Sequence, residues 1–310
     1  MLAKIENEAL RLEVNPGLGA SPAAFQAKIQ GEWADILRPT PRPLPEKSSL
    51  YSSFILAPYS NRIRAAKFGF AGQEYQLEAN TPQGNAQHGD VRNRPWQVHY
   101  PEANTLECTF DSRDFTDLNW PWPFTMRVVY SLREHRFATE LELTNTGDSP
   151  MPAGFGLHPY FVRRLPGSIR DAVLDFHADG VYLTDESLIP TDGMKPIPPE
   201  LDFSQAQSLE GQQVDAVFGG WDGRVVLEWP GANVRLVMET SFRGDSRVVD
   251  PVFGHLVVFT APDGTLALEP VSHVTDGFNL LARGVPDTGV RVLGPGESLQ
   301  GTVRITLEGL

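Results

Sequence analysis

Short runs of alternating polar and apolar residues, separated by turns, constrain the fold of this chain most. Side chains alternate between the two faces of a β-strand, so this period marks strands with one buried face. The 28 glycines and 26 prolines are spread along all 310 residues and divide the runs. The pattern predicts an all-β fold, a large antiparallel β sandwich with few short helices. The runs lie at residues 10–14, 105–110, 127–132, 137–143, 225–229, 234–238, 256–259 and 303–307.

Helical periodicity is scarce along the chain. Only residues 201–218 are predicted to hold one or two short helical turns. The proline-rich stretch at 40–45 is too short to separate two domains, and composition does not change from one end to the other. We therefore predict a single domain over residues 1–310.

Composition excludes several classes of partner and predicts a location. A net charge of −13 disfavours nucleic acid and anionic membranes, which both select clustered Lys and Arg. Cys108 is the only cysteine, so an internal disulfide is impossible. The first residues contain no hydrophobic signal core, and no run approaches the roughly 18 apolar residues of a membrane span. These features predict a cytoplasmic protein, either a monomer or a homodimer.

A histidine and a glutamate, 111 positions apart, are the first candidates for chemistry. His158 and Glu269 each interrupt an apolar run, on the face opposite to its apolar side chains. Gly154, Gly156 and Ala267 share those faces, so a ligand could approach the backbone closely. A carboxylate in an apolar setting has a raised pKa and can act as a base near neutral pH. A histidine in such a place is more commonly a hydrogen-bonded core residue.

Other residues carry weaker signals, each with a structural alternative. Arg62 ends an apolar run and either binds hydroxyls or forms a surface ion pair. His88 lies in a polar loop and either binds a ligand or bonds its own backbone. His88, His158 and Glu269 could also form a metal site, but cupin ligands cluster far more closely than these, so we expect no metal. The tryptophans either stack on a sugar or pack in the core, namely Trp96, Trp120 and Trp122.

Six segments, in this order, resemble the aldose 1-epimerase (galactose mutarotase) family. No single segment is specific, but their order is, and together with residues 14–19 they cover most of the chain. They are Asn61-Arg62-Ile63, residues 72–80, Gln87-His88-Gly89 with Trp96, residues 157–161 around His158, residues 214–218 around Asp215, and residues 268–272 around Glu269 with Asn279.

The resemblance implies a galactose mutarotase-like β sandwich and an acid–base isomerase of sugars. Glu269 would remove the proton of the anomeric hydroxyl, and His158 would protonate the ring oxygen. The opened ring would rotate and close from the other face, which interconverts the α and β anomers of a hexose without a cofactor. The resemblance assigns sugar binding to four further residues, Asn61, Arg62, His88 and Asp215.

Because the sequence departs from the family pattern at several positions, it does not identify which sugar is the substrate. Ala20 and Asp90 stand where many members have glycine, and residues 120–124 differ from the loop of galactose-type members. Arg163 and Arg164 could bind a phosphate or another anion, so a mutarotase of hexose 6-phosphates or other anionic sugars is an alternative. A noncatalytic carbohydrate-binding sandwich is a second alternative, and a metal-dependent cupin-like enzyme is a weaker third.

Overall fold

The computed structural model describes residues 1–240, 242–243, 246–247 and 252–310. Nearly every regular element in these residues is a β-strand, and the paired strands are antiparallel to their neighbours. The predicted all-β fold is therefore confirmed. No helix among the described residues is long and apolar enough to cross a membrane.

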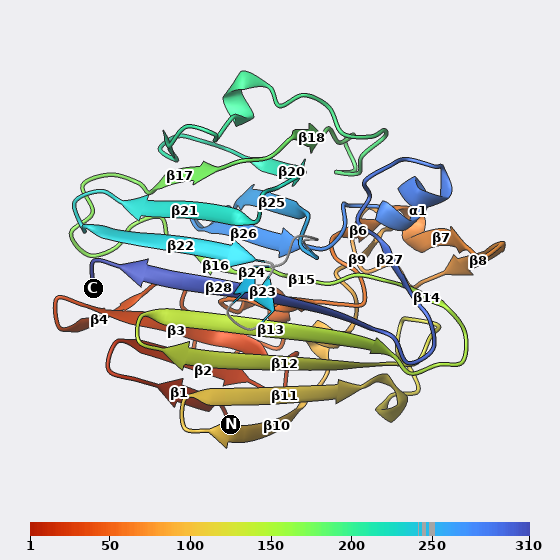
Figure 1. Ribbon diagram of the computed structural model, residues 1–310, viewed down its shortest axis with the longest axis horizontal. Coiled ribbons are helices and arrows are strands. Elements are labelled where there is room, and N and C mark those ends of the chain that lie inside the picture. Colours follow the sequence, from red (N-terminus) through yellow and green to blue (C-terminus); the bar gives the residue numbers. More distant parts are fainter. Residues whose placement is uncertain (241, 244–245, 248–251) are drawn as a thin grey trace.

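The larger sheet contains nine strands, and the C-terminal strand lies in its middle (Figure 1). Six of the eight alternating runs form strands of this sheet, and the other two lie in the sheets described next. In order across the sheet, the strands are β10 (Gln97–Glu102), β11 (Thr105–Asp111), β12 (Phe124–Arg133), β13 (Arg136–Asn145), β28 (Ser298–Glu308), β22 (Val234–Thr240), β21 (Arg224–Trp229), β17 (Val173–Phe176) and β19 (Gln207–Ser208).

A second sheet of seven short strands packs on one face of the first. It contains β18 (Gly180–Tyr182), β20 (Asp215–Gly219), β25 (His255–Thr260), β26 (Leu266–Val271), β15 (Gly156–Leu157) and β5 (Ile55–Leu56), with β16 (Tyr160–Phe161) also paired to β26. A third sheet joins β1 (Ala3–Glu6), β2 (Leu10–Asn15), β3 (Ser21–Ile29) and β4 (Glu32–Asp35).

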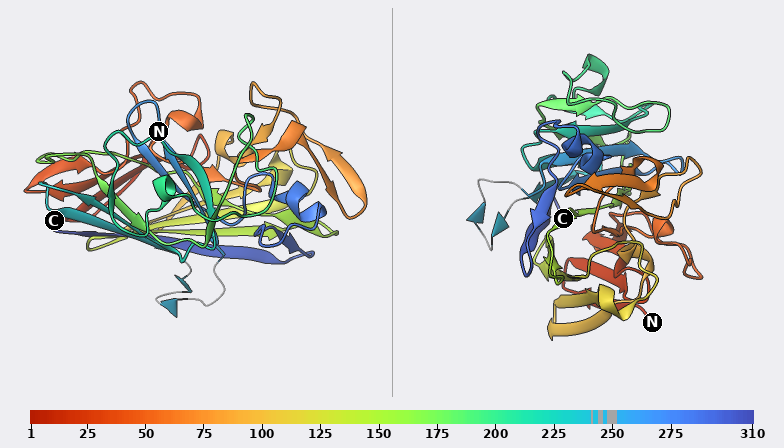
Figure 2. Two further views of the ribbon diagram at one scale, coloured as in Figure 1. Left: turned by 90° about the horizontal axis from the view of Figure 1, so that it is seen from above. Right: turned by 90° about the vertical axis from the view of Figure 1, so that its right-hand side faces the viewer.

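Short strand pairs and single helical turns complete the fold, and Figure 2 shows the strand pair β23–β24 projecting from the body. The pairs are β6 (Arg62–Ile63) with β9 (Ala86–Gln87), β7 (Lys67–Phe70) with β8 (Gln73–Gln76), β14 (Met151–Ala153) with β27 (Arg291–Leu293), and β23 (Phe242–Arg243) with β24 (Ser246–Arg247). The helices are α1 (Gly277–Ala282) and the 3₁₀ turns Ser48–Leu50, Arg64–Ala66, Val91–Asn93, Ser112–Asp114 and Pro199–Leu201.

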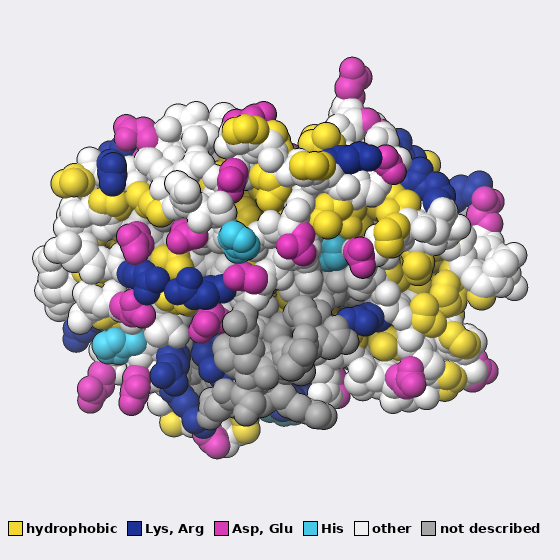
Figure 3. Space-filling model, turned by 45° about the horizontal axis from the view of Figure 1, so that its top comes forward, with side chains coloured by type: hydrophobic (Ala, Val, Ile, Leu, Met, Phe, Trp, Pro, Cys, Tyr) yellow, Lys and Arg dark blue, Asp and Glu magenta, His cyan; other side chains and the backbone are white. Residues whose placement is uncertain are grey.

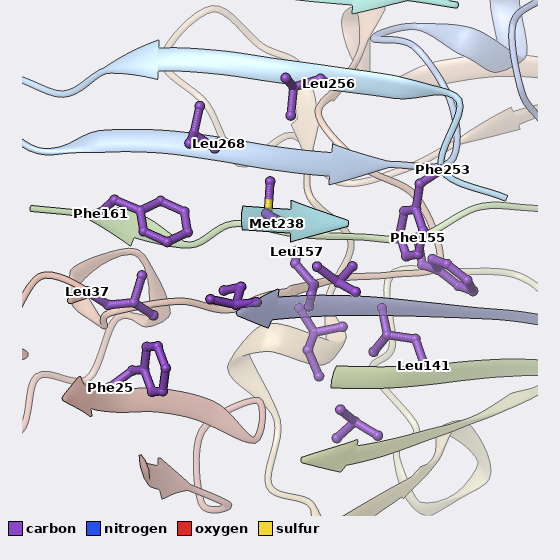
Figure 4. Packing of buried hydrophobic residues seen from close by; sticks show 14 of the residues in the cluster. Phe25, Leu37, Leu141, Phe155, Leu157, Phe161, Met238, Phe253, Leu256 and Leu268 are labelled. Atoms are coloured by element: carbon purple, nitrogen blue, oxygen red, sulfur yellow. The ribbon is translucent and has the colours of Figure 1, made fainter. Parts of the chain in front are cut away.

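Apolar side chains from the facing sheets interdigitate in one large core (Figure 4). Leu256 and Leu268 enter it from the second sheet, and Leu141 and Met238 enter it from the first. On the central strand β28, a glycine makes room for aromatic rings from the second layer: a Cβ at Gly301 would lie only 2.7 Å from a ring atom of Phe253.

The second sheet is buried on both faces, and the two faces carry different kinds of side chain. Along β26, Leu266 and Leu268 point into the main core, as the alternation predicts. Ala267 and Val271 point the other way, into a smaller apolar cluster, and Glu269 lies between them in sequence on that same side. The strand therefore places its carboxylate on the face away from the main core.

The one local prediction of helix was wrong, and the α-helix of the structure was not predicted. Within residues 201–218 only the end of a 3₁₀ turn remains at Leu201, and the rest forms strand β19, the start of strand β20 and irregular segments between them. The α-helix instead covers Gly277–Ala282, too short to produce a periodic pattern. Tertiary contacts hold it: Oδ1 of Asp276, the residue before it, accepts hydrogen bonds from the backbone of Arg64 and the side chain of Asn279.

Candidate active site

A pocket of about 240 Å³ opens on the face of the second sheet that points away from the main core. This volume is below the roughly 300–1,000 Å³ of sites for drug-sized ligands, so the pocket suits one small molecule. All six residues that the sequence predicted for the site line it, namely Asn61, Arg62, His88, His158, Asp215 and Glu269. The other lining residues are Ser49, Phe54, Gln87, Arg92, Tyr160, Val257 and Phe259.

Strand register brings the two central residues together. The pairs Gly156–Val271 and Tyr160–Ala267 share one antiparallel register, which places His158 directly opposite Glu269. On the next strand, Val257 pairs with Glu269 and continues the row. The backbone N–H of His158 also donates to the carbonyl of Phe54, 3.0 Å away, on the other side. The histidine and the glutamate are therefore held by neighbouring strands of one sheet.

His158 and Glu269 touch each other in the pocket. Nε2 of His158 lies 3.1 Å from Oε1 of Glu269, and both side chains are almost completely buried. A sugar whose anomeric centre is to lie between the two residues must therefore displace this direct contact. Because the second carboxylate oxygen, Oε2, has no hydrogen-bond partner among the described residues, it remains able to accept a proton from a ligand.

Gly154 and Gly156 were expected to let a ligand approach the backbone beside His158, but they do not. A Cβ at Gly154 would lie 2.1 Å from the ring of His273, and a Cβ at Gly156 would lie 2.6 Å from Val271. Protein side chains already fill the space beside both glycines. Their absent side chains allow close packing of the sheet, and neither residue lines the pocket.

Burial favours the uncharged forms of the central pair. Loss of water raises the pKa of Glu269 well above its ordinary value, and the charge of Asp215 raises it further. Loss of water lowers the pKa of His158 well below its ordinary value, and the charges of Arg92 and Arg38 act in the same direction. The buried contact therefore favours one proton shared by the two side chains over a separated carboxylate and imidazolium.

These shifts predict how stability depends on pH. Above pH 4.5 the unfolded chain loses the Glu269 proton while the folded protein keeps it, so stability falls as pH rises through the folded pKa. His158 contributes the opposite trend: its share is complete above pH 6.5 and is lost as pH falls through its folded pKa. Glu269→Gln removes only the first trend.

When the pH is raised from about 5 to about 8, the wild type should lose stability through Glu269, and Glu269→Gln should not. The change in the free energy of unfolding over this range should therefore be more positive in Glu269→Gln than in the wild type. Urea titrations of both proteins at the two pH values measure this difference. The expectation is wrong if the two proteins change by the same amount.

His88 is oriented by Asn61 and can donate a hydrogen bond into the pocket. The backbone N–H of Asn61 donates to the ring nitrogen Nδ1 of His88, 3.1 Å away. The backbone N–H of His88 donates in return to the carbonyl of Asn61, at 2.8 Å. Because Nδ1 is an acceptor, the ring proton resides on Nε2. Burial and the charge of Arg92 lower the pKa of His88, which keeps the ring neutral. Both residues adopt positive φ angles, 52° for Asn61 and 66° for His88.

Arg62 and Asp215 form the polar side of the pocket next to Glu269. Nη1 of Arg62 donates to the side-chain oxygen of Asn61, 3.1 Å away. The charges of Asp215 and Glu269 both act on the Arg62 guanidinium. The Asp215 residue is exposed at the rim of the pocket. Partial burial of its carboxyl group by the surrounding protein nevertheless raises its pKa. A guanidinium and a carboxylate so placed can bind the hydroxyls of a sugar.

The structure adds residues that sequence reasoning missed. Phe54 and Tyr160 each stack against the His158 ring, with centroids 4.5 Å away. Arg92 also lines the pocket; its only sequence signal was its position four residues after His88. Arg163 and Arg164 lie outside the pocket, where both bind Asp171. The three tryptophans are buried in the main core, as the structural alternative held, and none lines the pocket.

Within the part of the chain that the structure describes, no three His, Cys, Asp or Glu side chains are arranged to hold a metal ion. In the candidate trio, Nδ1 of His88 accepts the hydrogen bond from Asn61, and Nε2 of His158 faces Glu269.

Comparisons with known proteins connect this pocket to a family. The sequence profile described as "Aldose 1-epimerase" matches residues 2–306. The chain belongs to the aldose 1-epimerase family. Membership supports a mutarotase-type isomerase with a sugar as its substrate, in agreement with the resemblance seen in the six sequence segments.

Relatives of this aldose 1-epimerase family member share its length and fold. The uncharacterized protein YphB of Escherichia coli (strain K12) is 29% identical over 291 residues, which cover 91% of this chain and 93% of YphB. A putative aldose 1-epimerase from Escherichia coli K12 has a TM-score of 0.82 at 24% identity, covering 100% and 99% of the two chains. A galactose 1-epimerase from Lactobacillus acidophilus NCFM has a TM-score of 0.76 at 17% identity, covering 98% and 93%. At these identities the solved structures support the galactose mutarotase-like fold.

Proposed function

We propose that this protein is an aldose 1-epimerase that interconverts the α and β anomers of an aldohexose by general acid–base catalysis. The observation that carries the proposal is the His158–Glu269 contact in a pocket of monosaccharide size, within a chain of this family. Ring opening needs one proton removed from the anomeric hydroxyl and one delivered to the ring oxygen. A carboxylate and a histidine in contact can exchange the protons that both transfers require.

The proposed reaction begins when the sugar displaces the direct contact, and the proton shared by the pair stays on His158, which leaves Glu269 as the carboxylate. The anomeric hydroxyl gives its proton to Oε2 of Glu269, and its oxygen becomes the carbonyl oxygen as the bond from C1 to the ring oxygen breaks. The ring oxygen takes a proton from the His158 imidazolium. Rotation about the C1–C2 bond then presents the other face of the carbonyl. Ring closure reverses both proton transfers, so atoms and charges balance without an additional reactant.

The remaining residues of the pocket hold the sugar in this reaction. Nε2–H of His88 donates to the ring oxygen or a neighbouring hydroxyl. Arg62 donates to hydroxyls and Asp215 accepts from them, beside the carboxylate that acts as base. Correct placement of the reacting atoms supplies much of the rate enhancement in such sites.

Anomer exchange in pure sugars tests the proposal. NMR exchange spectroscopy on equilibrated aldohexoses measures the rate at which α and β signals interconvert, with and without protein. We expect the protein to accelerate exchange of at least one sugar in proportion to its concentration. Sugar binding without acceleration would support a noncatalytic carbohydrate-binding sandwich instead. Full activity after exhaustive chelation is expected, and loss of activity that added metal restores would favour the metal-dependent alternative.

A further inference from the structure

A buried histidine outside the proposed reaction connects the strand of Glu269 to two other residues of the pocket. His273 lies four residues after Glu269, is almost completely buried and does not line the pocket. Its ring nitrogen Nε2 accepts a hydrogen bond from the backbone N–H of Ser60, 3.0 Å away. The carbonyl of His273 accepts a second bond, from the Ser60 hydroxyl at 3.2 Å. Ser60 directly precedes Asn61 and Arg62, which do line the pocket.

The His273 ring is neutral, and its acceptor nitrogen is fixed in place. Because Nε2 receives the Ser60 N–H, the ring proton resides on Nδ1, which donates to the carbonyl of Val274 at 2.8 Å. Burial lowers the pKa of His273 to about 4, so the ring keeps this form near neutral pH. Two glycines make room for the ring: a Cβ at Gly154 would lie 2.1 Å from it, and a Cβ at Gly277 would lie 3.1 Å from Nδ1.

Asp276 holds the same part of the chain from the other side. Its backbone N–H donates to the carbonyl of Arg62, 2.8 Å away. Its buried carboxylate oxygen Oδ1 accepts a hydrogen bond from the backbone N–H of Arg64 at 2.9 Å. The backbone before Asn61 and the backbone after it are therefore both bonded to residues 273–276.

The backbone held in this way does not follow local preference. Asn61, Ala65 and Ala66 have positive φ angles of 52°, 51° and 55°. Such angles are unfavourable for residues with a Cβ and persist where surrounding contacts impose them. At the far end, the N–H of Ala65 has its own partner, Oδ1 of Asn85 at 3.0 Å. Without the bonds from residues 273–276, the backbone around Asn61 would relax to another conformation.

Residues 272–276 are in turn fixed to the strands that hold the central pair. They continue directly from β26, which carries Glu269. The backbone N–H of Ser272 donates to the carbonyl of Phe155 at 2.8 Å, and the Ser272 hydroxyl accepts from the N–H of Phe155 at 2.9 Å. Phe155 lies three residues before His158. The strands that position the histidine and the glutamate therefore also position His273.

We propose that His273 and Asp276 are positioning residues that fix Asn61 and Arg62 relative to Glu269. The inference rests on the proposed function, in which Asn61 and Arg62 belong to the sugar-binding part of the pocket. Neither positioning residue lines the pocket, so each acts through the backbone that it holds. Contacts with hydroxyls that do not react serve the bound sugar and the transition state alike. Their displacement therefore raises KM and leaves kcat nearly unchanged.

Two variants of His273 test the proposal. Glutamine and methionine have similar lengths, but only glutamine has an oxygen that can accept the Ser60 N–H. We expect His273→Met to raise KM for the best aldohexose by about 10-fold or more, with kcat within about 3-fold of the wild type. His273→Gln should keep KM within about 3-fold of the wild type. NMR exchange over a range of sugar concentrations measures both constants.

A second pair of variants and a control exclude a merely structural role. Asp276→Ala removes the acceptor for the Arg64 N–H and should raise KM, whereas Asp276→Asn keeps an oxygen and should not. This pair decides the question if His273→Met does not fold. Leu227 is buried in the large sheet and does not line the pocket, so Leu227→Ala should lower the urea midpoint without changing KM. A His273→Met protein that loses stability but keeps the wild-type KM would overturn the positioning role, as would equal KM values for the two His273 variants.

Calorimetric measurement of sugar binding separates this inference from the proposed function. If the wild type binds a sugar but does not exchange its anomers, the proposed mutarotase activity is overturned. Binding that is at least about 10-fold weaker in His273→Met, and not in His273→Gln, then still supports the positioning role. If the wild type exchanges anomers and neither pair of variants differs in KM, the positioning role alone is overturned. If the wild type neither binds nor exchanges any aldohexose, both are overturned.

Discussion

Replacing Glu269 by Gln is expected to lower kcat for anomer exchange by about 10²- to 10⁴-fold, the range typical for loss of a general base. The amide has nearly the same shape as the carboxyl group but cannot accept the proton of the anomeric hydroxyl. Its oxygen can still face Nε2 of His158, so the local packing should survive. The measurement is NMR exchange at saturating sugar, with binding followed separately by calorimetry.

A matched control replaces a carboxylate on the outer surface of the large sheet. Glu228 on β21 pairs with Arg235 at 3.1 Å on the surface and does not line the pocket. Glu228→Gln should leave exchange unchanged and alter stability by no more than about 0.5 kcal/mol. A Glu269→Gln protein that binds sugar and exchanges anomers within about 3-fold of the wild-type rate would contradict the proposed role of Glu269 as the base.

Phe155→Ala is expected to lower the free energy of unfolding by about 3–5 kcal/mol, the range for deleting a buried aromatic ring. The Phe155 side chain is completely buried between the sheets and lies 5.3 Å from the ring of Phe253. It packs over Gly301 on β28, where a Cβ would lie 3.2 Å from its ring. Removing the ring leaves a cavity beside strand β15, which directly precedes His158. Urea unfolding at neutral pH measures the loss.

The control for this prediction is an aromatic residue at the surface. Tyr100 on β10 is 54% exposed, so Tyr100→Ala should change the free energy of unfolding by no more than about 0.5 kcal/mol. If Phe155→Ala cost no more than Tyr100→Ala, the ring would not be a structural link between the two sheets.

Predictions from local alternation succeeded because the period of a strand is a property of neighbouring residues. Each of the eight alternating runs lies in a strand, including the long β12, β13 and β28. The same rule placed Leu157 in the main core and His158 on the opposite face. The order of the family's segments then named six residues that all line one pocket. Figure 3 shows the acidic and basic side chains mixed over one face of the molecule.

Predictions failed where contacts distant in sequence decide the outcome. Helix α1 depends on Asp276 bonding to Arg64, 212 positions away, so its own six residues carry no clear signal. The glycines at 154 and 156 make space for His273 and Val271, which local sequence could not distinguish from space for a ligand. Arg163 was a candidate for binding an anionic sugar, but its guanidinium binds the carboxylate of Asp171 outside the pocket.

The sequence by itself determined which residues form strands, which face of each strand carries the polar groups and which family the segments resemble. Only the tertiary structure decided that His158 and Glu269 touch, because their contact depends on the register of strands that are far apart in the chain. It also decided that Arg92 reaches the same pocket. Alternation repeats within a strand and is visible in its residues, whereas register and charge pairing arise only when separate strands and loops pack together.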